Sequence, residues 1–111
     1  MNPHLKLVNN VSQLRFEFDY SRNAVFFQSR IIQLSPHEAD ILHILLKNRR
    51  HVTPLDALIH RVYGVTESDT TTVSIRASVH SLRKKLAATG IAINAKTRTG
   101  YEIDFTKMIL S

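Results

Sequence analysis

The sequence predicts an α+β fold in which an N-terminal antiparallel β-sheet precedes three helices and a closing β-hairpin. Three observations predict it. Apolar and polar residues alternate in short runs at both ends of the chain, three segments with helical apolar spacing lie between them, and capping residues mark helix starts. A length of 111 residues favours one domain, residues 1–111, with its core at about 14–105.

The N-terminal sheet is predicted from three short runs. Residues 14–19 alternate as in a half-buried strand, and the β-prone runs 24–27 and 30–34 follow after turn-forming residues. Residues 1–10 show no clear pattern, and the few residues after Phe105 are expected to fray.

Three helices are predicted between the strands. The first begins at a capping box formed by Ser35 and Glu38, and the second opens at Thr53 and Pro54 and stops at Gly64. The third is expected from about Thr71 to Thr89. Its apolar residues are spaced by 4, 3 and 4, as one buried helix face requires: Ile75, Val79, Leu82 and Leu86.

The closing hairpin is predicted from the alternating runs 91–94 and 100–105, joined by residues 95–99. Aromatic residues at alternating positions of the strands could stack on single-stranded nucleic acid, but burial in the core is the expected role of Phe16, Phe18, Phe27 and Tyr101.

Charge is unevenly distributed along the chain. The formal net charge is +6, and residues 71–100 contain six basic side chains and no Asp or Glu, whereas the remaining residues carry nine of each sign. The six are Arg76, Arg83, Lys84, Lys85, Lys96 and Arg98. Such a one-sided distribution favours a polyanionic partner, nucleic acid first. The alternative is a solvated basic face without a partner.

The third helix has a candidate DNA-binding face opposite and beside its apolar seam. This face consists of Val73, Arg76, Ala77, His80, Ser81, Arg83 and Lys84. Small residues permit close approach, while Arg, Lys and His reach phosphates or base edges in a major groove. The hairpin tip adds Lys96, Thr97 and Arg98, which suit contacts with the DNA backbone or the minor groove. A structural alternative explains residues 83–85 as cations that solvate the helix end and favour its dipole.

In order and spacing, four segments resemble the OmpR/PhoB-type winged-helix effector domain, over about residues 14–105. The segments are Leu34-Ser-Pro-His-Glu38, Tyr63-Gly64, Val79-His-Ser-Leu-Arg-Lys-Lys-Leu86 and Thr97-Arg-Thr-Gly-Tyr101. The resemblance implies a four-stranded N-terminal sheet, three helices and a hairpin wing. It also implies a transcriptional regulator that binds double-stranded DNA sequence-specifically, with the third helix in the major groove. Such domains usually bind direct repeats as tandem head-to-tail copies, which suggests a tandem homodimer on DNA.

Four positions depart from the pattern of that family. A basic residue is common where Val73 stands, an Asp where Arg76 stands, an Arg where Ser81 stands and a Gly where Arg98 stands, while Arg83 keeps its place. The face stays as basic as before, so DNA binding is expected, but the family's target sequence does not carry over. Family members usually also contain a receiver domain with a phosphorylated Asp. The present chain has no room for one, so phosphorylation within it is not the expected control.

Other chemistry is not predicted. The chain contains no Cys, and no pair among its six His has the i, i+4 spacing of a metal site. It shows no Gly-rich phosphate loop and no nucleophile–base pair, so we expect neither an enzyme nor a cofactor. No apolar run is long enough to cross a membrane and no export signal is visible, which predicts the cytoplasm.

The main rival function is protein binding, in which a winged helix holds RNA polymerase or another regulator. Residues 65–70 form a predicted polar loop where the resemblance places a polymerase-contacting loop, and its acidic side chains could meet a basic partner. The plainer interpretation is a solvated connector.

Overall fold

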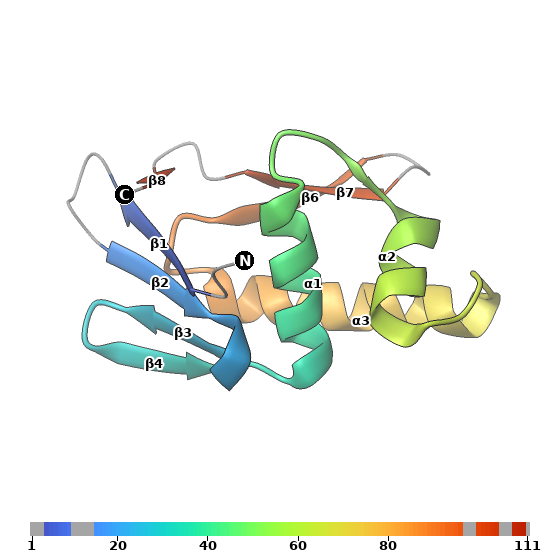
Figure 1. The fold of residues 1–111 in the computed structure, drawn as a ribbon, viewed down its shortest axis with the longest axis horizontal. Coiled ribbons are helices and arrows are strands. Elements are labelled where there is room, and N and C mark those ends of the chain that lie inside the picture. The colour runs from blue at the N-terminus through green and yellow to red at the C-terminus, as the bar shows by residue number, and fades with distance from the viewer. Residues whose placement is uncertain (1–3, 10–14, 97–99, 105–107, 111) are drawn as a thin grey trace.

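Two antiparallel sheets flank three helices in the computed structural model (Figure 1). The structure describes residues 4–9, 15–96, 100–104 and 108–110. Its elements are β1 His4–Asn9, β2 Arg15–Asp19, the 3-10 turn η1 Tyr20–Arg22, β3 Ala24–Phe27, β4 Arg30–Gln33, α1 Pro36–Lys47, β5 Thr53–Pro54, α2 Leu55–Tyr63, α3 Asp69–Leu86, β6 Ala92–Lys96, β7 Gly100–Asp104 and β8 Met108–Leu110.

The N-terminal sheet has five strands in the order β4-β3-β2-β1-β8. The strands β2, β3 and β4 confirm the predicted runs, and Asn23 takes the positive φ of 52° that the predicted turn requires. Two expectations were wrong. Residues 4–9 form β1, and β8 pairs with it where the chain was expected to fray. Strand β1 pairs with β2, which follows it in the chain, and with β8 at the opposite end of the chain, and the short local patterns revealed neither pairing.

The second sheet has three strands in the order β5-β7-β6, so the predicted hairpin is confirmed and a two-residue strand joins it. Strand β5 occupies the residues expected to open the second helix, and α2 begins at Leu55 with Pro54 as its N-cap. Helix α2 ends at Gly64, whose φ is +72°, as predicted.

Capping boxes start two of the helices. At α1 the Ser35 hydroxyl accepts from the Glu38 N–H at 3.1 Å, and the Glu38 carboxylate accepts from the Ser35 N–H at 2.7 Å, as predicted. A second box, between Ser68 and Thr71, starts α3 at Asp69, earlier than expected. Helix α3 also ends earlier, at Leu86, because the Thr89 hydroxyl donates to the Leu86 carbonyl and the chain turns away.

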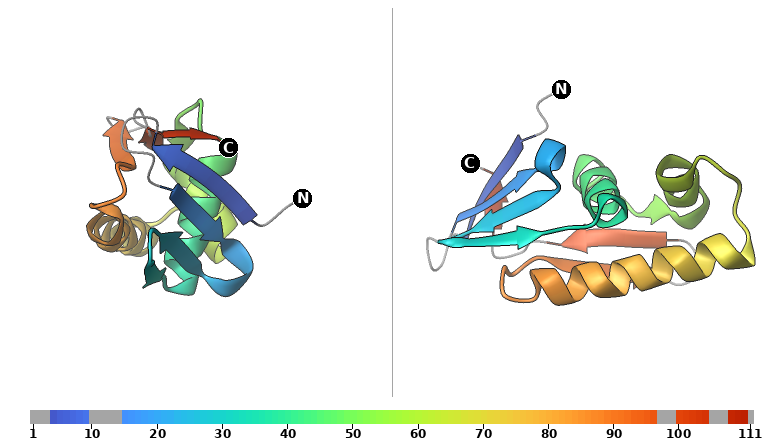
Figure 2. Two further views of the ribbon diagram at one scale, coloured as in Figure 1. Left: turned by 90° about the vertical axis from the view of Figure 1, so that its left-hand side faces the viewer. Right: turned by 90° about the horizontal axis from the view of Figure 1, so that it is seen from below.

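One core joins both sheets to the helices. The predicted seam of α3 is confirmed, since Ile75, Val79, Leu82 and Leu86 are all buried. The aromatic residues Phe16, Phe18, Phe27 and Tyr101 are buried in the same cluster, as expected. Figure 2 shows α3 running along one side of the molecule, with α1, α2 and the hairpin packed on its other side. The opposite face of α3 is therefore exposed along its length.

The close contact between β5 and β7 requires glycine at position 100. Gly100 pairs with Pro54 and has a φ of +151°, and a Cβ built on it would lie 1.9 Å from the Thr53 carbonyl oxygen. Gly64 also has a positive φ, but a Cβ there would meet nothing within 4 Å. A substitution at Gly64 would therefore cause backbone strain alone, whereas a substitution at Gly100 would add a steric clash to that strain.

We expect Gly100→Ala to lower the free energy of unfolding by about 2–3 kcal/mol, because it adds a clash to a strained φ. Gly64→Ala is the matched control and is expected to cost about 1 kcal/mol, from its left-handed backbone alone. Urea unfolding of both variants measures the difference. Equal losses would contradict the inferred clash between β7 and β5.

Candidate nucleic-acid interface

The exposed face of α3 is the centre of the candidate site. Six of the seven residues predicted for this face are exposed: Val73, Arg76, Ala77, His80, Arg83 and Lys84. Because the opposite seam of the helix is buried, this face is held at a fixed orientation towards solvent. It offers cationic donors beside small and apolar side chains.

The seventh predicted residue, Ser81, does not belong to this face. It is half-buried, and its proximity helps to lower the pKa of the Glu38 carboxyl on α1. Lys85 lies on the same flank of α3, and its ammonium is 2.6 Å from the Glu38 carboxylate. At roughly 100° per residue, positions 81 and 85 both fall on the flank of the seam that faces α1. The contact of Ser81 with DNA stays a prediction, for a side chain that is less exposed than the other six.

The Glu38 carboxylate is almost completely buried, with a side-chain exposure of 4%. Burial alone would raise the pKa of this carboxyl. Hydrogen bonds from Lys85 and from the Ser35 N–H, together with the proximity of Ser81, outweigh burial and bring the pKa below its ordinary value. The carboxylate therefore caps α1 and joins α1 to α3 while it remains ionised.

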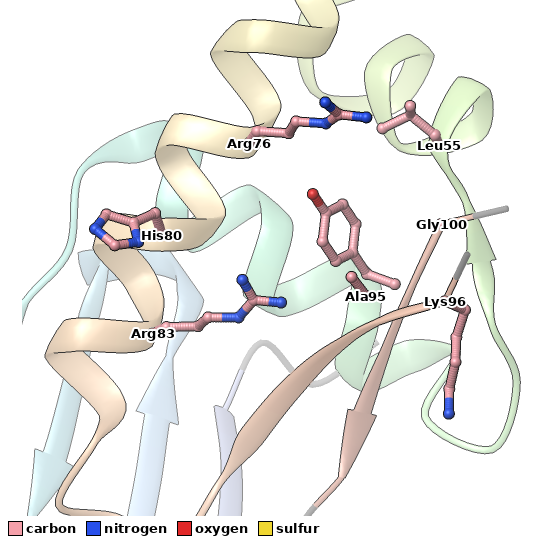
Figure 3. A pocket seen from close by; sticks show the side chains of 8 residues that line it. Leu55, Arg76, His80, Arg83, Ala95, Lys96 and Gly100 are labelled. Carbon is pink, nitrogen blue, oxygen red and sulfur yellow. The ribbon is translucent and has the colours of Figure 1, made fainter. Parts of the chain in front are cut away.

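Arg83 lies on the other flank of α3, against the hairpin. Its Nε donates to the Ile93 carbonyl at 2.7 Å, and its guanidinium carbon lies 5.8 Å from the centre of the Tyr101 ring. Figure 3 shows the side chain extending from α3 towards the strands. Arg83 thus links the helix to the hairpin, a role that its sequence position did not indicate.

A groove of about 470 Å³ runs between α3, the first residue of α2 and the hairpin (Figure 3). Its lining among the described residues includes three cations and no carboxylate: Leu55, Arg76, His80, Arg83, Ala95, Lys96, Gly100 and Tyr101. Lys96 lies 3.5 Å from Glu102 of the neighbouring strand, in an exposed pair. The predicted tip residues Thr97 and Arg98 lie outside the described residues. The groove therefore joins the basic face of α3 to the start of the predicted wing.

The loop before α3 is shorter than predicted. Residues 65–68 connect α2 to α3, while Asp69 and Thr70 form the first turn of the helix. Val65 is exposed, with 47% of its surface accessible, and Glu67 is exposed beside it. Only this shorter segment can act as a connector or contact loop.

Two histidines on α1 are occupied by aromatic contacts. His43 stacks on Tyr20 at 4.1 Å between ring centres, and His37 meets the edge of Tyr63 at 4.8 Å. Burial lowers the pKa of His43, with help from the nearby charge of Lys47.

Within the described part of the chain, no three His, Asp or Glu side chains gather as metal ligands would. A search of the same part found no helix long and apolar enough to span a membrane.

Known proteins share both the sequence pattern and the fold. The profile of the family described as "Transcriptional regulatory protein, C terminal" matches residues 28–103. The structure is similar to the DNA-binding domain of E. coli CadC, with a TM-score of 0.73 and 19% identity over 96% of this chain and 97% of that one. A search of curated proteins found no significant match.

Two further similar structures were solved with DNA. One is the Klebsiella pneumoniae RstA DNA-binding domain in complex with the RstA box, with a TM-score of 0.65 and 27% identity over 78% of this chain and 88% of that one. The other is the AdeR DNA-binding domain in complex with an intercistronic region, with a TM-score of 0.65 and 23% identity over 80% of this chain and 93% of that one.

Sequence reasoning missed the contacts that orient α3. The capping box identified Glu38, but not its pairing with Lys85, 47 positions away. A helical wheel places Ser81 and Lys85 on one flank and Arg76 and Arg83 on the other. This grouping is the sequence signal from which contacts on two sides of α3 could have been expected. It does not say which neighbour each flank meets.

The ionised state of Glu38 predicts an acid-sensitive fold. Its folded pKa lies below the ordinary 4.5, so the stability that it contributes is complete above about pH 4.5 and is lost as the pH falls through the folded pKa. Glu38→Gln should flatten this part of the pH profile and cost about 1–3 kcal/mol at neutral pH, because Lys85 loses its charged acceptor. Urea unfolding between about pH 3 and pH 7 measures both effects.

Glu67→Gln is the matched control, because Glu67 is an exposed carboxylate in the loop before α3. It should change neither the stability nor the acid slope measurably. If Glu38→Gln kept the wild-type slope, another carboxylate would be responsible for acid sensitivity.

Proposed function

The chain belongs to the OmpR/PhoB-type family of transcriptional regulatory proteins, a family of sequence-specific DNA-binding domains, and from this premise we propose how it holds DNA. Helix α3 enters the major groove, and the β6–β7 hairpin lies against the backbone or in the adjacent minor groove. The observation that carries this proposal is the exposed basic face of α3, backed by a buried seam and continuous with a groove whose described lining has no carboxylate.

The N-terminal half of the exposed face is the part that reads bases. Recognition helices contact base edges mainly with their first turns, because their later turns rise towards the backbone. In α3 this assigns Val73, Arg76, Ala77 and His80 to base edges and Lys84 to phosphate. Arg and His donors match the acceptors that purines and thymine present in the major groove.

Arg83 has a different proposed role from the one its exposure suggests. Its Nε already donates to Ile93, and its guanidinium packs on Tyr101. An arginine held this way positions the hairpin relative to α3 and presents its remaining N–H groups towards phosphate. We therefore assign it to backbone contact and positioning rather than to base reading.

The hairpin tip supplies contacts that do not depend on sequence. Lys96 is exposed at the end of β6, and Thr97 and Arg98 follow it in the chain. Cations on a protruding tip neutralise phosphates, and an Arg can enter a narrow A·T-rich minor groove. Binding of two copies in tandem on direct repeats is part of the proposal, since one short helix reads few base pairs.

The family and the fold are those of DNA-binding regulators rather than of enzymes. Nothing in the proposed role needs a cofactor. A regulator of this kind acts where the DNA is, so we propose that this domain works in the cytoplasm.

A second candidate function is contact with RNA polymerase through residues 65–68. Val65 and Glu67 are exposed on this connector immediately before α3, where a protein bound to DNA could touch a neighbour. Loss of transcriptional activation with intact DNA binding in a Glu67→Ala variant would support this role.

Salt dependence tests the DNA interface directly. Lys85 is paired with Glu38, so the other five basic side chains between residues 71 and 100 suggest about 4–5 neutralised phosphates per protomer, and hence a log–log slope of about −4 for affinity against salt. Fluorescence anisotropy with a random duplex at several salt concentrations gives the slope. A slope near zero would overturn the proposal and favour a protein-binding role.

Arg76 and Arg83 are a matched pair of arginines on α3. Comparing their alanine variants distinguishes contact with base edges from positioning of the hairpin. Arg76→Ala should cost about 1–3 kcal/mol on a selected site, relax base preference and leave stability unchanged. Arg83→Ala should lower the free energy of unfolding by about 1 kcal/mol, because the Ile93 carbonyl loses its donor, and should weaken selected and random duplexes alike. Titrations on both duplexes with melting curves distinguish them. Identical behaviour of the two variants would contradict the division of roles.

A further inference from the structure

Val73 is an exposed apolar residue in the middle of a polar surface. Its exposure is 67%, and among the described residues only Ile31 and Val65 are comparable large hydrophobic side chains. Ile31 lies on the N-terminal sheet and Val65 in the connector, so Val73 is the member of this group on the basic face of α3. A largely exposed valine among basic side chains requires a physical explanation.

The fold itself does not explain Val73. It belongs neither to the core cluster nor to the partly buried residues packed against that cluster. A β-branched side chain also lowers helix propensity slightly relative to Ala or a long polar residue. An exposed valine at this position therefore contributes nothing to the isolated domain, and its apolar surface is available for a ligand.

Ala77 continues the apolar strip one turn later. Residues four apart lie on the same helix face, and a rise of 1.5 Å per residue separates their Cα atoms by about 6 Å along the axis. Base pairs are stacked about 3.4 Å apart, so the two side chains span about two base pairs. Arg76 flanks this strip, and its cation would reach the neighbouring polar base edges or phosphates.

We propose that Val73, with Ala77 beside it, recognises the 5-methyl groups of thymines in the target site. Thymine alone among the four bases presents an apolar group in the major groove. A valine there gains contact with a methyl group, while it leaves the polar edge of a cytosine without a partner. This inference rests on the proposed entry of α3 into the major groove and adds the base that the helix prefers.

Removal of single methyl groups from the DNA tests the inference. A site is first selected from a random duplex library with the wild-type protein, and each thymine of the selected duplex is then replaced in turn by deoxyuridine. This change removes one methyl group and keeps base pairing. Affinity should fall about three- to fivefold at one thymine or at two thymines about two base pairs apart, as expected for one buried methyl group.

Val73→Ala links the methyl group to the residue. This variant should bind the unmodified duplex more weakly than the wild type and should lose most of the sensitivity at the thymine that Val73 contacts, while a second thymine contacted by Ala77 keeps its sensitivity. Ile31→Ala is the matched control, since Ile31 is 68% exposed on β4 of the N-terminal sheet and is not part of the groove lining, and it should keep the wild-type sensitivity. Alanine favours helix and the site is exposed, so Val73→Ala is expected to fold normally.

Each other outcome overturns the inference. A selected duplex that tolerates deoxyuridine at every thymine would show that no methyl group is read, while DNA binding would stand. Undiminished sensitivity at every thymine in Val73→Ala would assign the methyl contact to another residue. If no duplex were enriched at all, the proposed DNA-binding function itself would fail.

Discussion

The buried carboxylate of Glu38 is the interaction on which the geometry of the DNA-binding surface depends. It accepts from the Ser35 N–H at the start of α1 and from the Lys85 ammonium of α3. Removing an ion from water is costly, and its partners do little more than offset that cost, so the main consequence of the contact is geometric. It fixes which side of α3 turns towards α1. The buried seam then leaves one face of α3 for DNA.

The opposite flank of α3 is held by a second polar contact, from Arg83 to the Ile93 carbonyl. This contact holds α3 and the hairpin at a fixed angle to each other within the folded domain. The hairpin is in turn fixed to the N-terminus of α2 through β5, where the absence of a side chain on Gly100 allows Thr53 to approach. Lys96 and the exposed face of α3 therefore line one groove.

The sequence predicted what local spacing encodes. The capping box at Ser35, the turn at Asn23 and the seam from Ile75 to Leu86 depend on neighbours a few residues apart, and the structure confirms them. Strand β8 depends on pairing with β1 across almost the whole chain, which no local pattern reveals. The same reason explains Ser81. A helical wheel gives its angle on α3, but the carboxylate that it lies near, Glu38, belongs to another helix.

Outside its buried seam, the surface of α3 consists of two flanks and a strip between them, and each of the three makes different contacts. One flank serves α1 through Ser81 and Lys85, the other serves the hairpin through Arg83, and only the strip between them is left for base edges. Of the departures from the family pattern, Val73 falls on this strip and Arg76 lies at its edge, while Arg83 keeps its place. A change confined to the strip alters which bases are preferred without moving the helix. The separation of orienting contacts from reading contacts therefore allows one scaffold to serve different target sequences.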